Sequence, residues 1–373
     1  MPEKHLHIIS FDIPYPPNYG GMIDVFYKVK ALHEAGIRIH LHCFEYGERK
    51  KSIELEAFCN SVNYYKRKSN KALLLSSLPY IVITRTSDEL INNLLKDKHP
   101  ILFEGLHCSY LLDDERLKTR LKIVRMHNIE HDYYNALAGV EENFFDQQYL
   151  KTEAKKLKRY ESILNKANHV IAISPADTQK LSEKYKNVIN VTAFHPNEEI
   201  SVKEGKGDFA LYHGNLKIAE NSEAALFLMR KIFNDLKIPL IVAGNNPSKK
   251  LINEAKKYNN IELKADIHTS EIHELIRSAQ INILPTFQET GIKLKLLAAL
   301  YNGRYCIVNS PMVIDTGLES LCSIKDTPEE MKKEITRLFN IPFDQKEKIK
   351  RKEILSKYFS NKKNAEKMIA LLN

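Results

Sequence analysis

Residues 279–310 read AQINILPTFQETGIKLKLLAALYNGRYCIVNS, and the order of apolar and polar residues in this stretch decides the fold class. An apolar run from Ile281 ends at Pro285, and a polar turn follows up to Gly291. Apolar residues then recur at helical spacing until Gly303, after which a second apolar run begins. The pattern predicts a strand, a loop, a helix and a strand. In an open parallel sheet such a loop lies at the carboxyl ends of the strands, where ligands bind.

Two lysines, Lys293 and Lys295, fall at the start of the predicted helix. The helix macrodipole disfavours cations there by a few tenths to about 1 kcal/mol each, so an anion at the same place would offset the cost. A diphosphate that accepts hydrogen bonds from the free backbone N–H groups of the helix start is such an anion. The alternative is that both lysines are only solvated and that salt screens the dipole.

The string ETGIKLKLLAALYNG resembles the donor-binding loop and helix of the GT-B glycosyltransferases, in particular the large family 4 of retaining enzymes, the glycosyl transferases group 1. The resemblance implies that Lys293 and Lys295 lie near the phosphates of the donor, that Glu289 touches the sugar and that Gly291 belongs to the binding loop. The second glutamate of the family motif, which holds the ribose hydroxyls, is replaced here by Ala298. A catalytically impaired protein therefore stays an alternative.

Length and composition set the limits of this interpretation. A chain of 373 residues is too long for one ordinary core and divides naturally into two domains. The hydrophobic content of 43% and the charged content of 28% are typical of a globular protein, and no apolar run approaches the roughly 20 residues that span a bilayer. The first residues, MPEKHLHIISF, lack the layout of a secretion signal. Five cysteines without a CxxC pair indicate reduced thiols in the cytoplasm.

The chain is basic, with a formal net charge of +9 and a pI of about 9.0. This balance favours anionic partners such as a nucleotide or an anionic lipid surface. Nucleic acid is not an expected partner, because the basic residues are spread along helices among acidic ones and no aromatic-basic recognition motif occurs.

The N-terminus predicts a βαβ unit. An apolar strand over 6–11 is followed by DIPYPPNYGG, which breaks regular structure, and then by a helix over 22–34. Gly20 and Gly21 allow the backbone to approach a phosphate or sugar at the helix start, while a simple tight turn is the alternative. The segments PPNYGG and LHEAG resemble the opening of the same glycosyltransferases.

Ionisable residues follow the next predicted strand, over 101–103. Glu104 and His107 lie at or just beyond the strand end, which is where catalytic groups are found in a doubly wound sheet. Packed, hydrogen-bonded side chains are the alternative interpretation of both residues.

A further strand, over 122–126, ends at His127 in the string HNIEH. These letters also fit H-x-x-E-H, a motif of zinc peptidases, but that motif belongs inside a helix and no third ligand is evident nearby. The pattern HNxE after a strand instead resembles the N-terminal half of the glycosyltransferases. The positions that match along their interdomain cleft are His127, Asn128, Glu130, Glu161 and Ser174. Capping of a helix is the alternative role for Ser174.

The second half of the chain repeats the alternation of strands and helices. One predicted strand ends at His213, and Gly214 and Asn215 open the loop after it. Relatives often carry Arg and Lys in this loop to hold the donor diphosphate, whereas the matching positions here are Asn215 and Glu220. The resemblance also implies that Asp266 lies near the nucleotide base.

The sequence therefore predicts an α/β protein with two Rossmann-like doubly wound parallel-sheet domains facing across a cleft, the GT-B fold. Residues 1–190 form the acceptor-side domain and residues 191–354 the nucleotide-sugar-binding domain. The helix over 355–373 is expected to pack back on the first domain.

By resemblance, the protein transfers a hexose from a UDP- or GDP-sugar to a glycan or polyprenyl-linked acceptor, with retention, in surface polysaccharide or glycoconjugate synthesis. The catalytic candidates are His107, Glu104, His127 and Glu289. No metal and no cofactor other than the nucleotide sugar is expected. The expected location is cytoplasmic, with contact between the basic C-terminal third and the inner face of the membrane as an addition. Alternatives are an impaired GT-B protein that binds a glycan or partner, a sugar-nucleotide epimerase or hydrolase and, remotely, a zinc peptidase.

Overall fold

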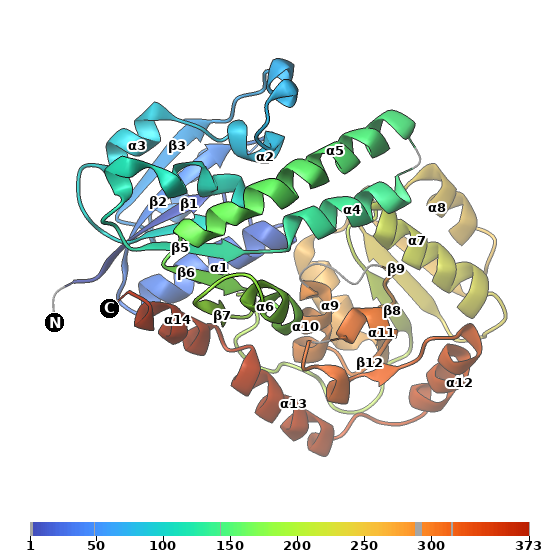
Figure 1. The fold of residues 1–373 in the computed structure, drawn as a ribbon. Helices are drawn as coiled ribbons and strands as arrows, with labels where there is room; N and C mark the ends of the chain where they lie inside the picture. Colours follow the sequence, from blue (N-terminus) through green and yellow to red (C-terminus); the bar gives the residue numbers. More distant parts are fainter. Residues whose placement is uncertain (1–2, 48, 142, 288–292, 315, 373) are drawn as a thin grey trace. The chain divides into compact units, whose positions relative to one another are not determined.

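The computed structural model describes residues 3–372 except 48, 142, 288–292 and 315. The chain forms two compact units (Figure 1). Unit 1 contains Met1–Pro196 together with Phe359–Asn373, and unit 2 contains Asn197–Glu289 and Lys293–Tyr358.

Unit 1 continues beyond residue 190 because the segment after its last strand is fastened to its core. Val191 and Phe194 are fully buried among the apolar residues of unit 1. The Arg125 guanidinium donates hydrogen bonds to the carbonyl oxygens of Val191, at 3.1 Å, and Thr192, at 3.0 Å. The boundary between the units therefore lies after Pro196.

The sheet of unit 1 has seven parallel strands in the order β3-β2-β1-β4-β5-β6-β7. The direction of the order reverses between β1 and β4, so the carboxyl ends of these two strands flank a topological switch point. The strands are β1 (His5–Ser10), β2 (Arg38–Glu45), β3 (Ser61–Lys66), β4 (Ile101–Glu104), β5 (Lys122–Met126), β6 (His169–Ala172) and β7 (Val188–Asn190).

Both faces of this sheet are covered, which explains why nearly all side chains of its central strands β1, β4 and β5 are buried. Successive side chains of β1 point to opposite faces. Ile9 packs into one hydrophobic cluster with residues of α3, while Leu6 and Ile8 pack into another with residues of α1 and α14. Figure 1 shows α1 and α14 together on one face of the sheet and α3 on the other.

Several helices of unit 1 begin after a residue whose side chain satisfies a free N–H group of the first turn. Ser87, Asn143 and Ser360 each accept a hydrogen bond from the first turn of the helix that follows. The helices are α1 (Gly20–Glu34), α2 (Tyr80–Ile83), α3 (Asp88–Leu94), α4 (Glu130–Val140), α5 (Phe144–Tyr160), α6 (Pro175–Ser182) and α14 (Asn361–Ala370), with 3-10 turns η1 (Ile53–Leu55), η2 (Lys71–Leu75), η3 (Leu106–Asp113), η4 (Glu115–Leu117) and η5 (Glu161–Lys166).

The sheet of unit 2 has six parallel strands in the order β10-β9-β8-β11-β12-β13. Its order reverses between β8 and β11, so a second switch point lies at the carboxyl ends of these strands. The strands are β8 (Ala210–His213), β9 (Leu240–Gly244), β10 (Ile261–Ala265), β11 (Ile281–Ile283), β12 (Tyr305–Val308) and β13 (Ser323–Ile324).

The helices of unit 2 include α10, which lies between β11 and β12 and thus confirms the predicted strand, loop, helix and strand. The helices are α7 (Ala219–Phe227), continued by a π-helical turn η6 (Leu228–Ile232), α8 (Lys249–Ala255), α9 (Thr269–Ser278), α10 (Leu294–Asn302), α11 (Ser310–Val313), α12 (Pro328–Phe339) and α13 (Gln345–Tyr358), with the 3-10 turn η7 (Glu319–Leu321). Two doubly wound parallel sheets are therefore present, as the sequence predicts.

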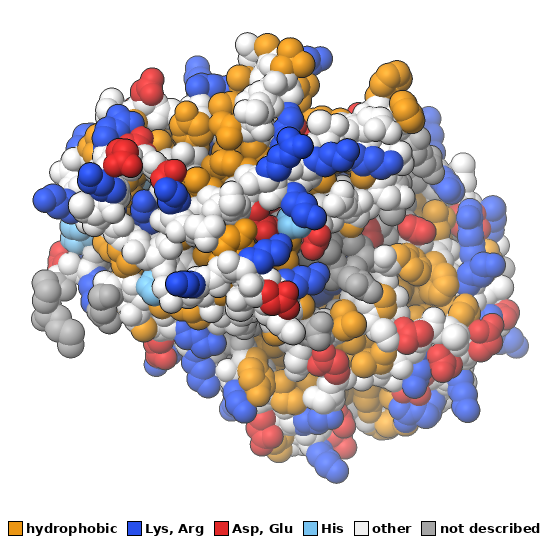
Figure 2. All heavy atoms as spheres, in the orientation of Figure 1, with side chains coloured by type: hydrophobic (Ala, Val, Ile, Leu, Met, Phe, Trp, Pro, Cys, Tyr) orange, Lys and Arg blue, Asp and Glu red, His pale blue; other side chains and the backbone are white. Residues whose placement is uncertain are grey.

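Basic and acidic side chains lie among one another, on both units, on the surface that Figure 2 shows. Many of the basic side chains also have acidic partners at short distance, such as Lys332 with Asp235 at 2.7 Å. None of the helices in the described part of the chain is long and apolar enough to cross a membrane.

Candidate functional site

The switch point of unit 1 brings together two of the predicted catalytic residues. Glu104 is the last residue of β4 and His127 directly follows β5. Because these strands are parallel neighbours, their ends meet, and His127 Nε2 lies 2.8 Å from Glu104 Oε2. Glu104 has no exposed surface, so it orients the imidazole of His127 rather than offering its own carboxylate to a ligand.

Two buried cations complete this cluster. Lys28 Nζ lies 2.6 Å from Glu104 Oε1 and 3.2 Å from Asp24 Oδ2. Asp24 also accepts two hydrogen bonds from Arg125, at 2.9 and 2.8 Å. Asp24 and Lys28 stand one helical turn apart on α1, and all four of these side chains are inaccessible to solvent. Two carboxylates are thus balanced by two cations before His127 is counted.

The cations decide the ionisation of the carboxylates. Burial alone would raise the pKa of Asp24, but Arg125 and Lys28 outweigh it and hold that pKa well below the usual range. Burial would also raise the pKa of Glu104, but Lys28 and His127 outweigh burial and lower that pKa. Asp24, Glu104 and His127 place ligand atoms close enough to hold a metal ion. A cation would have to displace Lys28 and Arg125 from that place, so this cluster does not fit a metal.

His107 lies beside His127 through an aromatic contact. Gly105, with φ of +66°, turns the chain after β4. The His107 ring then stacks on the Phe11 ring, with 4.8 Å between the ring centres. The rings of Phe11 and His127 meet edge to face, with 5.4 Å between the ring centres. Gly21 packs closely here, because a Cβ at this position would stand 2.7 Å from Phe11 Cζ and the ring would have to shift. The Gly-Gly turn at the start of α1 therefore reaches the same edge of the sheet as the two histidines.

Next to His107 lies a buried carboxyl group, Glu130, at the first residue of α4. Burial raises the pKa of Glu130 to about 8, Arg85 opposes this shift and Asp177 adds to it. Burial also lowers the pKa of His107 well below its usual value. His107 Nδ1 and Glu130 Oε1 are 3.8 Å apart, and neither atom has a hydrogen-bond partner among the described residues. A neutral acid and a neutral base thus lie side by side, an arrangement suited to proton transfer.

The string HNIEH does not form a shared metal site. His127 is bound to Glu104, whereas His131 Nδ1 lies 2.9 Å from Glu161 Oε2. Tyr185 also donates a hydrogen bond to Glu161, at 3.1 Å. Since His127 precedes α4 and has a different carboxylate partner, the zinc-peptidase alternative is wrong. Ser174 caps α6 by accepting a hydrogen bond from the N–H of Asp177.

Asp24, Lys28, Arg85 and Arg125 of this region are not among the residues predicted from the sequence. Asp24 and Lys28 had a usable signal, because opposite charges four residues apart inside an apolar helix indicate a buried pair. Arg85 had none, since it follows α2 in a segment without a clear pattern. Its Nε donates to the Phe11 carbonyl at 2.9 Å and its Nη1 to the Ile81 carbonyl at 2.7 Å, which fixes a buried cation beside His107.

In unit 2, Lys295 lies in the first turn of α10 and turns toward the end of β8. Its Nζ donates to Asn221 Oδ1 at 2.9 Å and lies 5.5 Å from the centre of the Tyr212 ring. Burial lowers the pKa of Lys295 to about 8, Glu220 opposes the shift and Lys293 adds to it. Lys295 is therefore a partly desolvated cation in the first turn of a helix, and its contact with a donor phosphate stays a prediction.

The loop after β8 is a tight turn that fits under Asn221. Asn221 Nδ2 donates to the Asn215 carbonyl at 3.0 Å, and a Cβ on Gly214 would stand 3.2 Å from Asn221 Cγ. A Cβ on Gly244 would collide with the Gly214 carbonyl oxygen at 1.8 Å, so β9 needs glycine where it passes this loop. The side chain of Asn215 accepts from the backbone of the same turn. Asn215 thus shapes the loop that the sequence assigns to the diphosphate.

The loop after β11 is tied to its neighbours on both sides. Thr286 donates a short hydrogen bond to Glu220, and its backbone N–H donates to Asn309 Oδ1 at 2.9 Å. Glu220 is therefore used to hold this loop. The predicted site residues Glu289 and Gly291 lie outside the described residues.

The two positions assigned to the nucleoside differ in character. Asp266 has a φ of 54° and accepts a hydrogen bond from the N–H of Asn246 at 2.7 Å, so it joins the loops after β9 and β10. Ala298 packs against a small hydrophobic cluster of unit 2. Asn302, one turn beyond, donates to Asn197 Oδ1 at 2.7 Å and is therefore already engaged.

The comparisons with known proteins agree with this geometry. Residues 208–340 match the family described as glycosyl transferases group 1. A protein of Klebsiella pneumoniae named "Uncharacterized 44.6 kDa protein in cps region" is 27% identical over 327 residues, which make up 81% of this chain and 82% of that protein.

Solved structures of glycosyltransferases share the fold over almost the whole chain. Sucrose-phosphate synthase from Thermosynechococcus elongatus superposes with a TM-score of 0.73 at 14% identity, covering 99% of this chain and 98% of that chain. A structure of S. aureus TarM with UDP and other ligands superposes with a TM-score of 0.65 at 12% identity, covering 99% of this chain and 100% of that chain. The lipopolysaccharide outer core galactosyltransferase WaaB superposes with a TM-score of 0.64 at 12% identity, covering 98% of this chain and 99% of that chain. The chain therefore has the GT-B fold.

Proposed function

We propose that this chain, which has the GT-B fold and matches the group 1 glycosyl transferases over residues 208–340, transfers a hexose from a nucleotide diphosphate sugar to a glycan or polyprenyl-linked acceptor. The relative in the cps region supports a place in polysaccharide or glycoconjugate synthesis. We further propose that the reaction proceeds with retention, needs no metal and takes UDP- or GDP-sugars on the cytoplasmic side of the membrane.

The position of Lys295 carries this proposal. It is a partly desolvated cation in the first turn of α10, at the switch point of unit 2, and the turn of Gly214 lies near it through Asn221. The leaving group of the reaction is a diphosphate, whose charge grows as the glycosidic bond breaks. A fixed cation and the N–H groups of a helix start stabilise that charge, and they need not be reorganised during the reaction.

Unit 1 supplies the groups that suit an acceptor. His127 is oriented by Glu104, and His107 lies beside the protonated Glu130. Such groups bind and orient a hydroxyl group and exchange its proton at neutral pH. The buried charges of Asp24 and Arg125 hold this edge of the sheet rigid, so that the histidines keep their geometry.

A second candidate function rests on Ala298. An alanine at the place of a ribose-binding glutamate favours a GT-B protein that binds a glycan or partner with little or no transfer. Asn302 does not replace the glutamate, because Asn197 and Ser201 already occupy its side chain. An epimerase or hydrolase of nucleotide sugars would use the same donor site and differs only in its product.

Calorimetric titration with a panel of UDP-, GDP- and TDP-sugars, followed by mass spectrometry of the reaction products, tests the proposal. We expect one class of donor to bind, and the sugar to appear on an added acceptor. Lys295→Met should lower donor affinity by about tenfold or more, the scale of a charge-assisted hydrogen bond.

Lys250→Met is the matched control, since Lys250 is the second residue of α8 as Lys295 is of α10, but is exposed. Binding without transfer would favour the impaired protein. A free monosaccharide or an epimerised donor would favour the hydrolase or epimerase. Equal donor affinity in both lysine variants would refute the assigned phosphate site.

A further inference from the structure

Strands β1 and β2 each carry the tripeptide His-Leu-His, at residues 5–7 and 40–42. Because side chains alternate along a strand, all four histidines point to the same face of the sheet. The parallel register places His7 opposite His40. A fifth histidine, His99, precedes β4 and adds its ring to the row.

His7 and His42 form the inner part of this row, and their ring nitrogens all have hydrogen-bond partners. His7 Nδ1 lies 2.8 Å from His42 Nε2, and His42 Nδ1 lies 2.8 Å from the Tyr65 hydroxyl. His7 Nε2 lies 3.0 Å from the Asp97 carboxylate. Both ring nitrogens of His7 and His42 are therefore occupied by protein partners.

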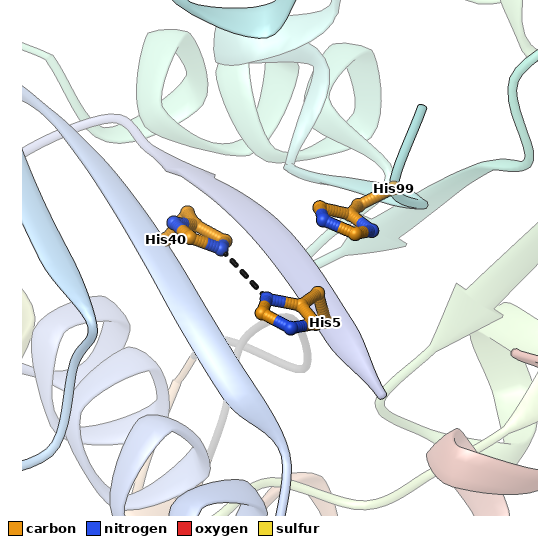
Figure 3. Close-up of side chains that lie close together, drawn as sticks. All are labelled: His5, His40 and His99. Atoms are coloured by element: carbon orange, nitrogen blue, oxygen red, sulfur yellow. Dashed lines mark hydrogen bonds between the residues drawn. The ribbon is translucent and has the colours of Figure 1, made fainter. Parts of the chain in front are cut away.

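His5, His40 and His99 form the outer part of the row, which lies nearer to solvent. His5 Nδ1 faces His40 Nε2 at 3.0 Å, and the His99 ring stacks on His5 at 4.3 Å with an angle of 9° between the planes (Figure 3). His40 Nδ1 lies 3.0 Å from Ser61 Oγ. All three rings are partly exposed, and no hydrogen bond to a ring nitrogen of His99 is found among the described residues.

We propose that His5, His40 and His99 form a binding site for a divalent transition metal ion of the zinc class. One nitrogen from each ring lies within 4.8 Å of the other two. In a tetrahedral zinc site with Zn–N bonds of about 2.0–2.1 Å, ligand nitrogens stand about 3.4 Å apart. The gap of 3.0 Å between His5 and His40 would open by a few tenths of an ångström, and the longest gap in the set, which is within 4.8 Å, would close to about 3.4 Å. The fourth position is left to water.

The tautomer of His40 favours this use. When His40 donates its Nδ1 proton to Ser61 Oγ, Nε2 keeps a lone pair, which accepts the proton of His5 Nδ1 in the absence of metal. A metal ion takes the place of that single proton between the two nitrogens. Ser61 then acts on His40 as the outer hydrogen-bond partners of metal-binding histidines usually do, by fixing the ring and its tautomer.

Metal binding requires the rings to turn. The lone pair of an imidazole nitrogen lies in the plane of its ring, and the nearly parallel rings of His5 and His99 do not yet point to one centre. His99 lies between α3 and β4 and is partly exposed, which leaves room for rotation of its ring.

The ligand set also defines the class of ion. Three imidazoles suit Zn²⁺, Ni²⁺ and Cu²⁺, whereas Mg²⁺ and Ca²⁺ prefer oxygen ligands. The site lies at the amino ends of β1 and β2, while Glu104 and His127 lie at the carboxyl ends of the neighbouring strands. The ion would therefore link two strands to the segment before β4 and stabilise unit 1 without touching a substrate.

Titration of the chelator-treated full chain with ZnCl₂, by calorimetry and thermal unfolding, tests the site. We expect saturable binding of Zn²⁺ and a higher melting temperature with Zn²⁺ but not with Mg²⁺. His99→Gln should weaken Zn²⁺ binding by about tenfold or more. His33→Gln, which changes an exposed histidine of α1, should bind as the parent does.

Co²⁺ gives a second readout, because the intense visible bands of a tetrahedral site should appear with the parent and be lost in His99→Gln. If His99→Gln melts at a lower temperature than the parent without metal, His5→Gln at the first residue of β1 provides the same test. Zn²⁺ affinity unchanged in both ligand variants, or a Co²⁺ spectrum without tetrahedral bands, would overturn the proposal.

Discussion

Lys28 Nζ lies 2.6 Å from Glu104 Oε1, and neither side chain has any exposed surface. A buried ion pair gives little net stability, yet the removal of one partner leaves an uncompensated charge in the interior. The pair joins the middle of α1 to the end of β4, where His127 is oriented. It therefore links the stability of unit 1 to the geometry of the predicted catalytic histidine.

The first prediction follows from this pair. Lys28→Met should destabilise unit 1 by about 3–5 kcal/mol, because Glu104 and Asp24 lose a buried cation. Urea unfolding followed by circular dichroism measures the change. The second variant, Lys28→Met with Glu104→Gln, should recover much of the loss, since the charge left behind is removed.

Lys30→Met is the control for this series. Lys30 lies on the same helix in a partly exposed pair with Glu34 at 3.7 Å, and such pairs contribute about 0–1 kcal/mol. Equal losses in Lys28→Met and Lys30→Met would contradict the role assigned to the buried pair.

The second prediction concerns Glu130, whose pKa is raised to about 8 by burial. An unfolded glutamate ionises near pH 4.3, so between that pH and pH 8 the folded state holds a proton that the unfolded state releases. The parent should therefore lose stability as the pH rises, by at most about 1.4 kcal/mol per pH unit from this group. Above pH 8 the loss should level off.

Glu130→Gln removes this titration. Its stability relative to the parent should increase from pH 5 to pH 8 in chemical denaturation experiments, while the exposed Glu183→Gln should follow the parent throughout. A constant difference between Glu130→Gln and the parent over this range would show that Glu130 is ionised in the folded state.

The order of strands and helices around the candidate sites of unit 1 and unit 2 could be predicted from the sequence. The apolar runs of β11 and β12 and the helical spacing of α10 were found, and so were the strand ends at Glu104 and His127. The two-residue strand β13 could not be predicted, because it is too short for a periodic pattern.

What the sequence could not supply was the pairing between distant elements. Arg125 and Asp24 are 101 residues apart, and nothing local in either segment names the partner. The row of histidines likewise requires the register of β1 against β2, which places two His-Leu-His segments on one face. Charge and polarity at strand ends are visible in the sequence, but their neutralisation in the interior is a property of the fold.

The third prediction uses the pKa of Lys295, which burial lowers to about 8. Below that pH the ammonium is charged and attracts a diphosphate. Above it the free protein loses the charge, so the affinity for UDP or GDP should fall by up to about tenfold per pH unit. Calorimetric titrations between pH 7 and pH 9 should show this decline in the parent and in Lys250→Met. A decline of the same size in Lys295→Met would exclude Lys295 as its cause.

The last prediction concerns the position of the missing glutamate. Ala298 is partly buried against the apolar cluster that contains Ala243 and Ile276. Asn302 is engaged with Asn197 and the Ala298 carbonyl, so neither residue offers a carboxylate to a ribose. If the ribose of the donor lies beside Ala298, Ala298→Glu should strengthen UDP or GDP binding by about 1–3 kcal/mol through hydrogen bonds to the ribose hydroxyls.

Ala298→Gln separates charge from size, because it adds a side chain of the same length without a carboxylate. We expect it to gain less affinity than Ala298→Glu, and both variants to keep the melting temperature of the parent within a few degrees. Tighter binding in Ala298→Glu alone would show a donor site that has lost one contact but kept its shape. Weaker binding in both variants would mean that the added side chains block the nucleoside, and that this chain holds the ribose from another side.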